Sequence, residues 1–262
     1  MTQTPDKTGE TDVPAWAVST RIARTEATVK LFILTGAGVS AESGLGTFRD
    51  AGGIWTRYDL QQVATPQGFA RNPVLVHEFY NARRKNLLGA EPNAAHAALA
   101  RLERELPGKG GRVFLCTQNV DDLHEQAGSR AVHHMHGELF RIRCVHCGDA
   151  RDWREDLSVF TLCPACRKAG GLRPDVVWFG EEPRDMEMIQ RELDQADLFV
   201  SIGTSGSVYP AAGFVAEARR AKVRTCEINL EPSDNARRFD EVVYGPATET
   251  LPAWVEKVLE RA

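Results

Sequence analysis

The chain contains no apolar run near the roughly 20 residues that a membrane-spanning helix needs. Its first residues, MTQTPDKTGETDVPAW, lack the basic start and apolar core of a secretory signal, and they predict a polar, flexible tail over residues 1–14. Basic charge is not in excess either, since 32 Lys and Arg face 36 Asp and Glu, for a net charge of −4. Binding to membranes or directly to nucleic acid is therefore not expected.

Cysteine is too sparse for a disulfide scaffold, because only six occur in 262 residues. Four of them form two CxxC pairs, and Cys116 and Cys226 lie alone inside apolar runs. This usage is typical of a reducing compartment, where thiols bind metal or fill a core. We expect a cytoplasmic protein, and we expect it to be a monomer.

Apolar runs that stop abruptly in small or polar residues recur along the chain. They are VKLFILTGAG (29–38), RVFLCTQN (112–119), ADLFVSIGTS (196–205) and KVRTCEINLEP (222–232). Because they lack clean alternation, they fit parallel strands that are buried on both faces. Helix-like stretches lie between them, at 92–108 and 209–221. The sequence therefore predicts an α/β fold with a Rossmann-like, doubly wound parallel sheet, which binds ligands at the carboxyl ends of its strands.

Two segments interrupt this alternation of strands and helices. Residues 137–175 hold both CxxC pairs and few apolar runs, and residues 51–90 begin Gly-rich and become helical. We expect these segments to form a smaller zinc-ribbon and helical lobe within one domain over residues 15–262. The Rossmann-like lobe is then expected at about 15–50, 91–136 and 176–262.

The two CxxC pairs supply four thiolates, from Cys144, Cys147, Cys163 and Cys166. Each pair turns two sulfurs toward one ion, and this spacing of the pairs is typical of a zinc ribbon. Four thiolates leave no open coordination position, so the sequence predicts one structural Zn²⁺. His146 lies between two of the cysteines and is a weaker alternative ligand. Residues 141–168 carry no interleaved aromatic platform, which argues against a nucleic-acid interface.

A glycine-containing loop, TGAGVSAESGLGTFRD (35–50), follows the first predicted strand. Gly36 and Gly38 match the first two glycines of a dinucleotide fingerprint, which permit a tight turn and close approach to a pyrophosphate. Ala41 takes the third position, where the fingerprint tolerates alanine. No acidic residue ends the next strand, so a simple hydride-transferring dehydrogenase is disfavoured.

The order of these motifs resembles that of the sirtuins, a family of NAD-dependent protein deacylases. It runs GAGVSAESG, TFR, TQNVDDLH (117–124), HG (136–137), the four cysteines, GTS (203–205) and INLEP (228–232). The similarity begins near residue 29 and is nearest to the bacterial CobB type, which carries Tyr-x-x-Arg after the glycine loop. It implies a Rossmann lobe and a small zinc lobe, with NAD and the acyl-lysine of a protein entering the cleft from opposite sides.

The resemblance implies roles for the residues that match the family's motifs. It assigns catalysis to His136 and Asn119, and the peptide and its acyl-lysine to Ala64, Tyr80, Arg83, Val177 and Phe179. The segment around Val177 is expected to add the peptide as a strand. NAD is expected to contact Gly36, Ala37, Gly38, Ser40, Phe48, Arg49, Gln118, Asn119, Val120, Asp121, Gly203, Thr204, Ser205, Asn229 and Ala247.

Three histidines occur in VHHMHGE (132–138). In an extended segment His134 and His136 share one face, and His133 points away. The family motif singles out His136 as the general base on a ribose hydroxyl, for which an imidazole suits neutral pH. The implied reaction uses no active-site metal and yields nicotinamide, free lysine and O-acyl-ADP-ribose. We expect ordinary structural roles for His133 and His134.

Two alternatives to deacylation remain open. Protein ADP-ribosyl transfer uses the same activation of NAD. A non-catalytic binding module is expected to lack Asn119, Asp121 or His136, all of which are present. The chain also departs from the family, which has Pro where Gly46 stands in the loop before Phe48. We expect this glycine to loosen the loop and weaken NAD binding without loss of the chemistry.

The helix-like stretch HEFYNARRKNLL (77–88) places Tyr80 and Arg83 on one face. In sirtuins that remove acidic acyl groups, a Tyr and an Arg at this spacing lie at the base of the acyl channel, and an alanine at the position of Ala64 widens it. The resemblance thus implies activity on succinyl- and malonyl-lysine as well as acetyl-lysine, with Arg83 pairing with the distal carboxylate. Arg84 and Lys85 are expected on a solvated face.

Overall fold

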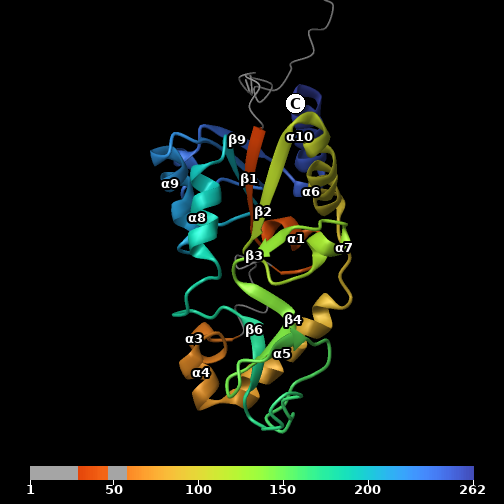
Figure 1. Cartoon of the computed structure of the whole chain (residues 1–262), viewed down its shortest axis with the longest axis vertical. Coiled ribbons are helices and arrows are strands. Elements are labelled where there is room, and N and C mark those ends of the chain that lie inside the picture. The colour runs from red at the N-terminus through yellow and green to blue at the C-terminus, as the bar shows by residue number, and fades with distance from the viewer. Residues whose placement is uncertain (1–28, 47–57) are drawn as a thin grey trace, which may run out of the picture.

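The computed structural model describes residues 29–46 and 58–262. Within them, six strands form one sheet and three strands form another, and Figure 1 shows the two sheets in an upper and a lower lobe. Three sequence predictions lie outside the described residues: the flexible tail over 1–14, Phe48 and Arg49. The division into lobes agrees in outline with the sequence, and its boundaries stay a prediction.

The larger sheet is parallel throughout, with the strand order β3-β2-β1-β7-β8-β9. The chain builds outward from β1 to β3 and then continues on the other side of β1 with β7, so the order reverses between β1 and β7. This confirms the predicted doubly wound α/β fold. The strands are β1 Val29–Thr35, β2 Gly111–Thr117, β3 Val132–His134, β7 Leu198–Ile202, β8 Arg224–Asn229 and β9 Glu241–Tyr244.

Both faces of this sheet are covered by helices, as Figure 1 shows. Leu31 and Ile33 of β1 pack with α6 and α10, whereas Phe32 and Leu34 pack with α8 and α9. All four side chains are at most 2% exposed, and burial of each stabilises the fold by about 1.5–3 kcal/mol. The missing alternation in the sequence therefore reflects burial on both faces. The helices are α6 Ala94–Glu105, α8 Met186–Asp194, α9 Phe214–Arg220 and α10 Ala247–Arg261.

Short elements connect the sheet and its helices. The two edge strands, β3 and β9, have partly exposed residues. They were not predicted from the sequence, because they contain no continuous apolar run. Every helix in the described part of the chain is too short or too polar to cross a membrane. The short helices are α1 Gly38–Ala41, α7 Leu123–Gln126, η2 Leu106–Lys109, η3 Ala211–Gly213 and η4 Ala236–Arg238.

The lower lobe packs three helices on an antiparallel sheet of order β5-β4-β6. Two of the helices, α4 and α5, begin with a polar N-cap residue followed by a proline. The Thr65 side chain accepts a hydrogen bond from the N–H of Gly68, and the Asn72 side chain accepts one from the N–H of Leu75. The elements are α3 Leu60–Val63, α4 Pro66–Arg71, α5 Pro73–Leu87, β4 Gly137–Cys144, β5 Ala150–Asp152 and β6 Leu172–Val176.

Arg84 on α5 is buried, which corrects the expectation of a solvated side chain. It is 1% exposed. Its Nε donates to the backbone oxygen of Leu139 at 3.1 Å, and its Nη1 donates to Asn81 Oδ1 at 2.7 Å and to the oxygen of Glu155 at 3.4 Å. Burial lowers the pKa of Arg84 to about 10. The guanidinium thus joins α5 to β4 and to the loop after β5, whereas Lys85 is exposed as expected.

Replacing Arg84 by Met is expected to lower the free energy of unfolding by about 1–3 kcal/mol, because buried carbonyl oxygens lose their donors. Lys85→Met, on the exposed side of the same helix, is the matched control and is expected to change it by less than about 0.5 kcal/mol. Urea denaturation followed by circular dichroism measures both. Equal effects of the two substitutions would contradict the structural role of Arg84.

Candidate active site

A cavity of about 1070 Å³ lies where the carboxyl ends of the parallel strands face the lower lobe. This is the point at which the strand order reverses, where such sheets bind ligands. The structure brings together here all of the predicted catalytic, NAD and substrate residues that it describes. They are Gly36, Ala37, Gly38, Ser40, Ala64, Tyr80, Arg83, Gln118, Asn119, Val120, Asp121, His136, Val177, Phe179, Gly203, Thr204, Ser205, Asn229 and Ala247.

The glycine loop lies directly on the end of β7. The N–H of Gly36 donates to the oxygen of Ile202 at 2.9 Å, and that of Gly38 donates to the oxygen of Gly203 at 2.8 Å. A Cβ atom on Gly38 would lie 2.7 Å from the Cα of Gly203, and one on Gly36 would lie 2.8 Å from its oxygen. Both glycines are thus required for contact between the two strand ends, in addition to any approach by a pyrophosphate.

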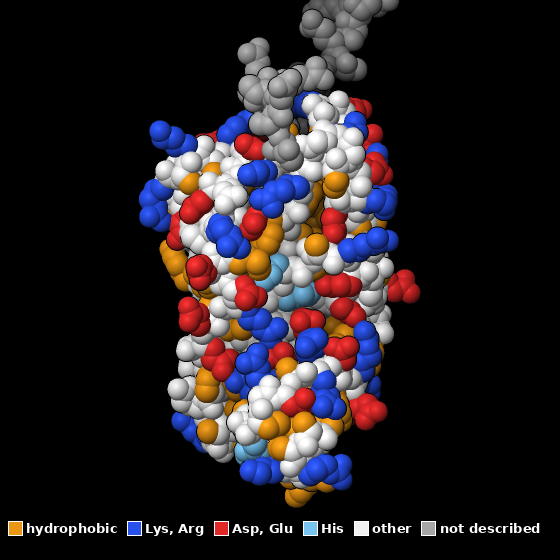
Figure 2. All heavy atoms as spheres, viewed as in Figure 1, with side chains coloured by type: hydrophobic (Ala, Val, Ile, Leu, Met, Phe, Trp, Pro, Cys, Tyr) orange, Lys and Arg blue, Asp and Glu red, His pale blue; other side chains and the backbone are white. Residues whose placement is uncertain are grey.

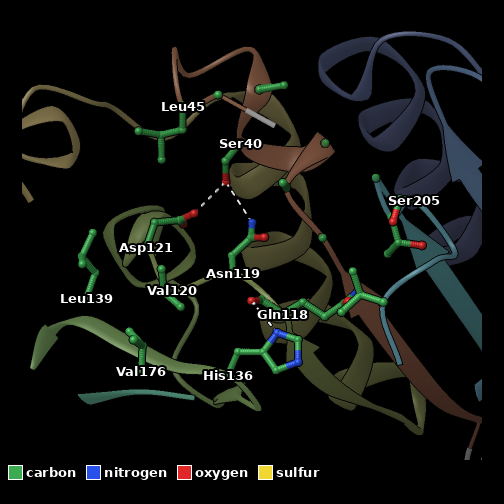
Figure 3. A pocket seen from close by; sticks show the side chains of 18 of the residues that line it. Ser40, Leu45, Gln118, Asn119, Val120, Asp121, His136, Leu139, Val176 and Ser205 are labelled. Atoms are coloured by element: carbon green, nitrogen blue, oxygen red, sulfur yellow. Dashed lines mark hydrogen bonds between the residues drawn. The ribbon is translucent and has the colours of Figure 1, made fainter. Parts of the chain in front are cut away.

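Ser40 is the centre of a buried hydrogen-bond network, shown in Figure 3. Its hydroxyl donates to Asp121 Oδ2 at 3.1 Å and accepts from Asn119 Nδ2 at 3.1 Å. Burial raises the pKa of Asp121. Three predicted site residues from the ends of β1 and β2 are therefore held together before any ligand binds.

His96 completes this network, and the sequence prediction missed it. Its Nδ1 accepts the backbone N–H of Asn93 at 3.2 Å, so its Nε2 carries the proton and donates to Ser40 Oγ at 3.3 Å. Burial lowers the pKa of His96 to about 4, which keeps the ring neutral. The signal that was available is the N-cap pattern Asn93-x-x-His96, in which the histidine takes the place of the usual Glu or Gln.

His136 is positioned through its Nδ1, which donates to the backbone oxygen of Gln118 at 3.1 Å, as Figure 3 shows. A carbonyl oxygen only accepts, so Nδ1 carries the proton and Nε2 holds the lone pair. Burial lowers the pKa of His136, although the bond to Gln118 opposes this shift. The ring is therefore a neutral base at neutral pH.

The other two histidines of this segment lie as their spacing predicts. His134 shares the side of His136, because its Nδ1 donates to the oxygen of Asn119 at 3.1 Å. Its Nε2 lies 2.8 Å from Glu125 Oε1. His133 points to the other side, where it stacks on Phe114 and lies 3.4 Å from Asp185.

The far end of the cavity is formed by Tyr80, Arg83 and Ala64 of the lower lobe. Tyr80 is 2% exposed, and burial raises the pKa of its hydroxyl, so the phenol is neutral. Burial lowers the pKa of Arg83, and Tyr80 and Asp121 favour its charged form. The guanidinium carbon lies 5.7 Å from the centre of the Tyr80 ring. A cation and a neutral hydroxyl are thus adjacent at this end.

Val177 and Phe179 line the cavity next to this end. The N–H of Val177 donates to the oxygen of His136 at 2.8 Å, and that of Phe179 donates to the oxygen of Ala64 at 2.9 Å. Neither N–H group is therefore available to a peptide. Strand addition stays a prediction and has to use other backbone groups of the segment.

The four cysteines of the lower lobe lie together, with all four sulfurs within 4.8 Å of one another. Two of the sulfur pairs, Cys144 with Cys166 and Cys147 with Cys163, are 3.8 Å apart. Four sulfurs at about 2.3 Å from one zinc ion stand about 3.8 Å apart at the corners of a tetrahedron, so the residues fit the predicted Zn²⁺. His146 is not in this cluster, and its Nε2 lies 3.3 Å from the oxygen of Ala169.

Charges of both signs are mixed on the face of the molecule that Figure 2 draws. On this face, Lys and Arg side chains alternate with Asp and Glu over both lobes, and His side chains lie at mid-height and near the lower end. A broad field of one sign is not present on that face. This distribution agrees with the net charge of −4.

Comparison with known proteins identifies the family. The model of the Sir2 family matches residues 36–210, and the chain belongs to this family, which confirms the resemblance to sirtuins. An NAD-dependent protein deacylase of Caulobacter vibrioides is 68% identical over 233 residues, which are 89% of this chain and 98% of the relative. The motif order seen in the sequence is therefore that of a family member over nearly its whole length.

Solved structures agree with the fold. A Sir2 homologue in complex with NAD is 38% identical, with a TM-score of 0.79, and the match covers 89% of this chain and 92% of that chain. A Sir2 structure with a deacetylated p53 peptide and 3′-O-acetyl ADP ribose is 29% identical, with a TM-score of 0.71 and coverage of 88% and 93%.

The cysteine cluster predicts a specific loss of metal. Cys144→Ser is expected to reduce bound zinc well below one ion per chain and to lower the melting temperature, because a structural zinc contributes directly to folding. Cys226→Ser, which changes a buried thiol outside the cluster, is expected to keep the zinc. Atomic absorption on purified protein measures the metal. Full zinc content in Cys144→Ser, or none in the unmodified protein, would rule out the site.

Proposed function

We propose that this chain is an NAD-dependent protein lysine deacylase that transfers the acyl group to ADP-ribose and releases nicotinamide. The observation that carries this proposal is the neutral His136 base in the same cavity as the Ser40, Asn119 and Asp121 network. The names of the relatives support it, since the Caulobacter protein is called an NAD-dependent protein deacylase.

We infer that NAD occupies the upper part of the cavity. Its phosphates would lie against the loop of Gly36 and Gly38, where side chains are absent. Its adenosine half would lie against Ser205, which follows β7, and Asn229, the last residue of β8. Asn119 and Asp121 would face the nicotinamide half. When bound, NAD would supply a ribose carbon that becomes electrophilic as nicotinamide leaves. The acyl oxygen of the modified lysine would be the nucleophile for this carbon.

In the proposed reaction His136 removes a proton from a ribose hydroxyl at Nε2. Its Nδ1–H bond to Gln118 fixes the ring orientation and keeps the lone pair on the other nitrogen. A base placed in this way contributes about 10²–10⁴-fold to the rate. Ser40, Asn119 and Asp121 act by orientation, because each is already hydrogen-bonded within the protein.

The acyl range follows from Tyr80, Arg83 and Ala64. We propose that this end accepts succinyl- and malonyl-lysine as well as acetyl-lysine, since a guanidinium and a neutral hydroxyl both donate to a carboxylate. Tyr80 is buried and Arg83 is partly buried, which strengthens such a pair because water competes less for both groups. Ala64, which lines the same cavity, contributes only a methyl group to it.

We further propose a reducing, cytoplasmic location, because Cys116 and Cys226 are buried free thiols and the other four cysteines form the metal cluster. The proposed lobes are those expected from the sequence, with NAD in the upper lobe and the acyl group at its border with the lower. A monomeric state remains part of the same proposal.

His136→Ala is expected to reduce deacylation of an acetylated peptide by at least about 100-fold, because the general base is lost. NAD binding by calorimetry and the melting temperature are expected to stay close to those of the unmodified protein. His133→Gln, on the opposite side of the segment, is the control and is expected to remain active. Mass spectrometry follows loss of the acyl group; undiminished turnover by His136→Ala, or gain of ADP-ribose on the peptide, would refute the proposal.

Arg83→Met is expected to lower the ratio of desuccinylation to deacetylation, measured as kcat/KM with matched peptides, by about 30-fold or more, because the distal carboxylate loses its charged partner. Lys85→Met removes the same charge from the exposed side of α5 and is expected to leave this ratio unchanged. Equal losses on both substrates in Arg83→Met would contradict carboxylate recognition.

A further inference from the structure

The Tyr80 hydroxyl has a partner that the sequence did not indicate. Trp178 is 2% exposed, and its indole Nε1 donates to the Tyr80 oxygen at 2.9 Å. The two residues are 98 positions apart in the chain, Tyr80 on α5 and Trp178 just after β6. Both line the far end of the cavity, beside Arg83.

The indole ring of Trp178 is held from two directions. The guanidinium carbon of Arg173 lies 3.4 Å from the ring centre, and Phe69 packs against the ring at 5.4 Å between centroids. Glu181 binds the Arg173 guanidinium through both of its oxygens, at 2.6 and 2.8 Å, and accepts the backbone N–H of Trp178 at 2.8 Å. The direction of the indole N–H is therefore fixed by packing and charge.

This geometry determines the polarity of the Tyr80 hydroxyl. An indole nitrogen only donates, so the Tyr80 oxygen is the acceptor and its own proton has to point elsewhere. Among the described residues, no group accepts that proton. Since burial raises the pKa of Tyr80, the proton stays on the oxygen. Tyr80 is thus presented as a donor next to the Arg83 cation.

We propose that Trp178 is a positioning residue for acyl selectivity, which fixes the Tyr80 hydroxyl as a donor toward acyl groups that end in a carboxylate. This inference rests on the proposed function, and it adds Trp178, held by Arg173 and Glu181, to the residues that define the substrate class. An acetyl methyl group accepts no hydrogen bond, so the fixed donor favours only acyl groups with a distal acceptor.

Trp178→Phe tests this role, because it keeps an aromatic ring next to Arg173 and Phe69 while it removes the indole N–H together with the five-membered part of the ring. The ratio of the kcat/KM values for desuccinylation and deacetylation is expected to fall about tenfold, because the KM for the succinyl peptide rises. Trp153→Phe is the matched control, since its indole nitrogen is buried without a hydrogen-bond partner among the described residues. It is expected to leave the ratio unchanged.

A double-mutant cycle separates a role through Tyr80 from a role in packing. If Trp178 acts through the Tyr80 hydroxyl, then Trp178→Phe combined with Tyr80→Phe is expected to lower the ratio no further than Tyr80→Phe alone. Multiplied losses would overturn the inference, as would equal losses by Trp178→Phe on succinyl and acetyl peptides. Melting temperatures of all variants identify any loss of fold.

The same measurements distinguish failure of this inference from failure of the proposed function. If Arg83→Met lowers the ratio and Trp178→Phe does not, only the role of Trp178 is overturned. If the unmodified enzyme removes acetyl but not succinyl groups, the acyl range fails and the inference fails with it. If no acyl peptide leads to release of nicotinamide, the deacylase proposal itself fails.

Discussion

The site depends on one backbone contact, between the turn after β1 and the end of β7. Gly36 and Gly38 donate to the oxygens of Ile202 and Gly203, and neither glycine has room for a Cβ atom. This contact continues the pairing of β1 with β7 past the ends of both strands, at the point where the strand order reverses. The residues that follow β1, β2, β7 and β8 consequently share one cavity, although they are far apart in the chain.

The polar groups above this contact are buried, and their pairing determines what they can do. Because an unpaired buried polar group costs about 1–3 kcal/mol, the neutral imidazole of His96 serves the network around Ser40 as a donor of defined direction. Burial keeps His96 uncharged, and its bond from Asn93 sets which nitrogen donates. The same logic applies at His136, where the backbone oxygen of Gln118 accepts the hydrogen bond of Nδ1–H and Nε2 is left as the base.

The lower lobe supplies the other end of the cavity and has its own sources of rigidity. The cysteine cluster holds its tip, and Arg84 joins α5 to β4 and to the loop after β5. One face of α5 thus carries Tyr80 and Arg83 to the cavity, while the neighbouring Arg84 packs inward. The proposed acyl selectivity and the stability of the lobe thus rest on adjacent residues of one helix, since successive residues point about 100° apart around its axis.

The sequence by itself determined the doubly wound sheet and the cysteine cluster, because these follow from local apolar runs and CxxC spacing. Through the resemblance to sirtuins it also indicated many of the residues that line the cavity. Only the tertiary structure decided which polar side chains are buried and what they bond. In the sequence, Arg84 is one of three consecutive cations. In the structure it is buried and donates a hydrogen bond to the backbone oxygen of Leu139 on β4, 55 positions away. His96 meets Ser40 across 56 positions, and Trp178 meets Tyr80 across 98. A helix or strand produces a periodic pattern of residues along the chain, which can be recognised in the sequence. Two side chains that form a hydrogen bond only after folding produce no such pattern.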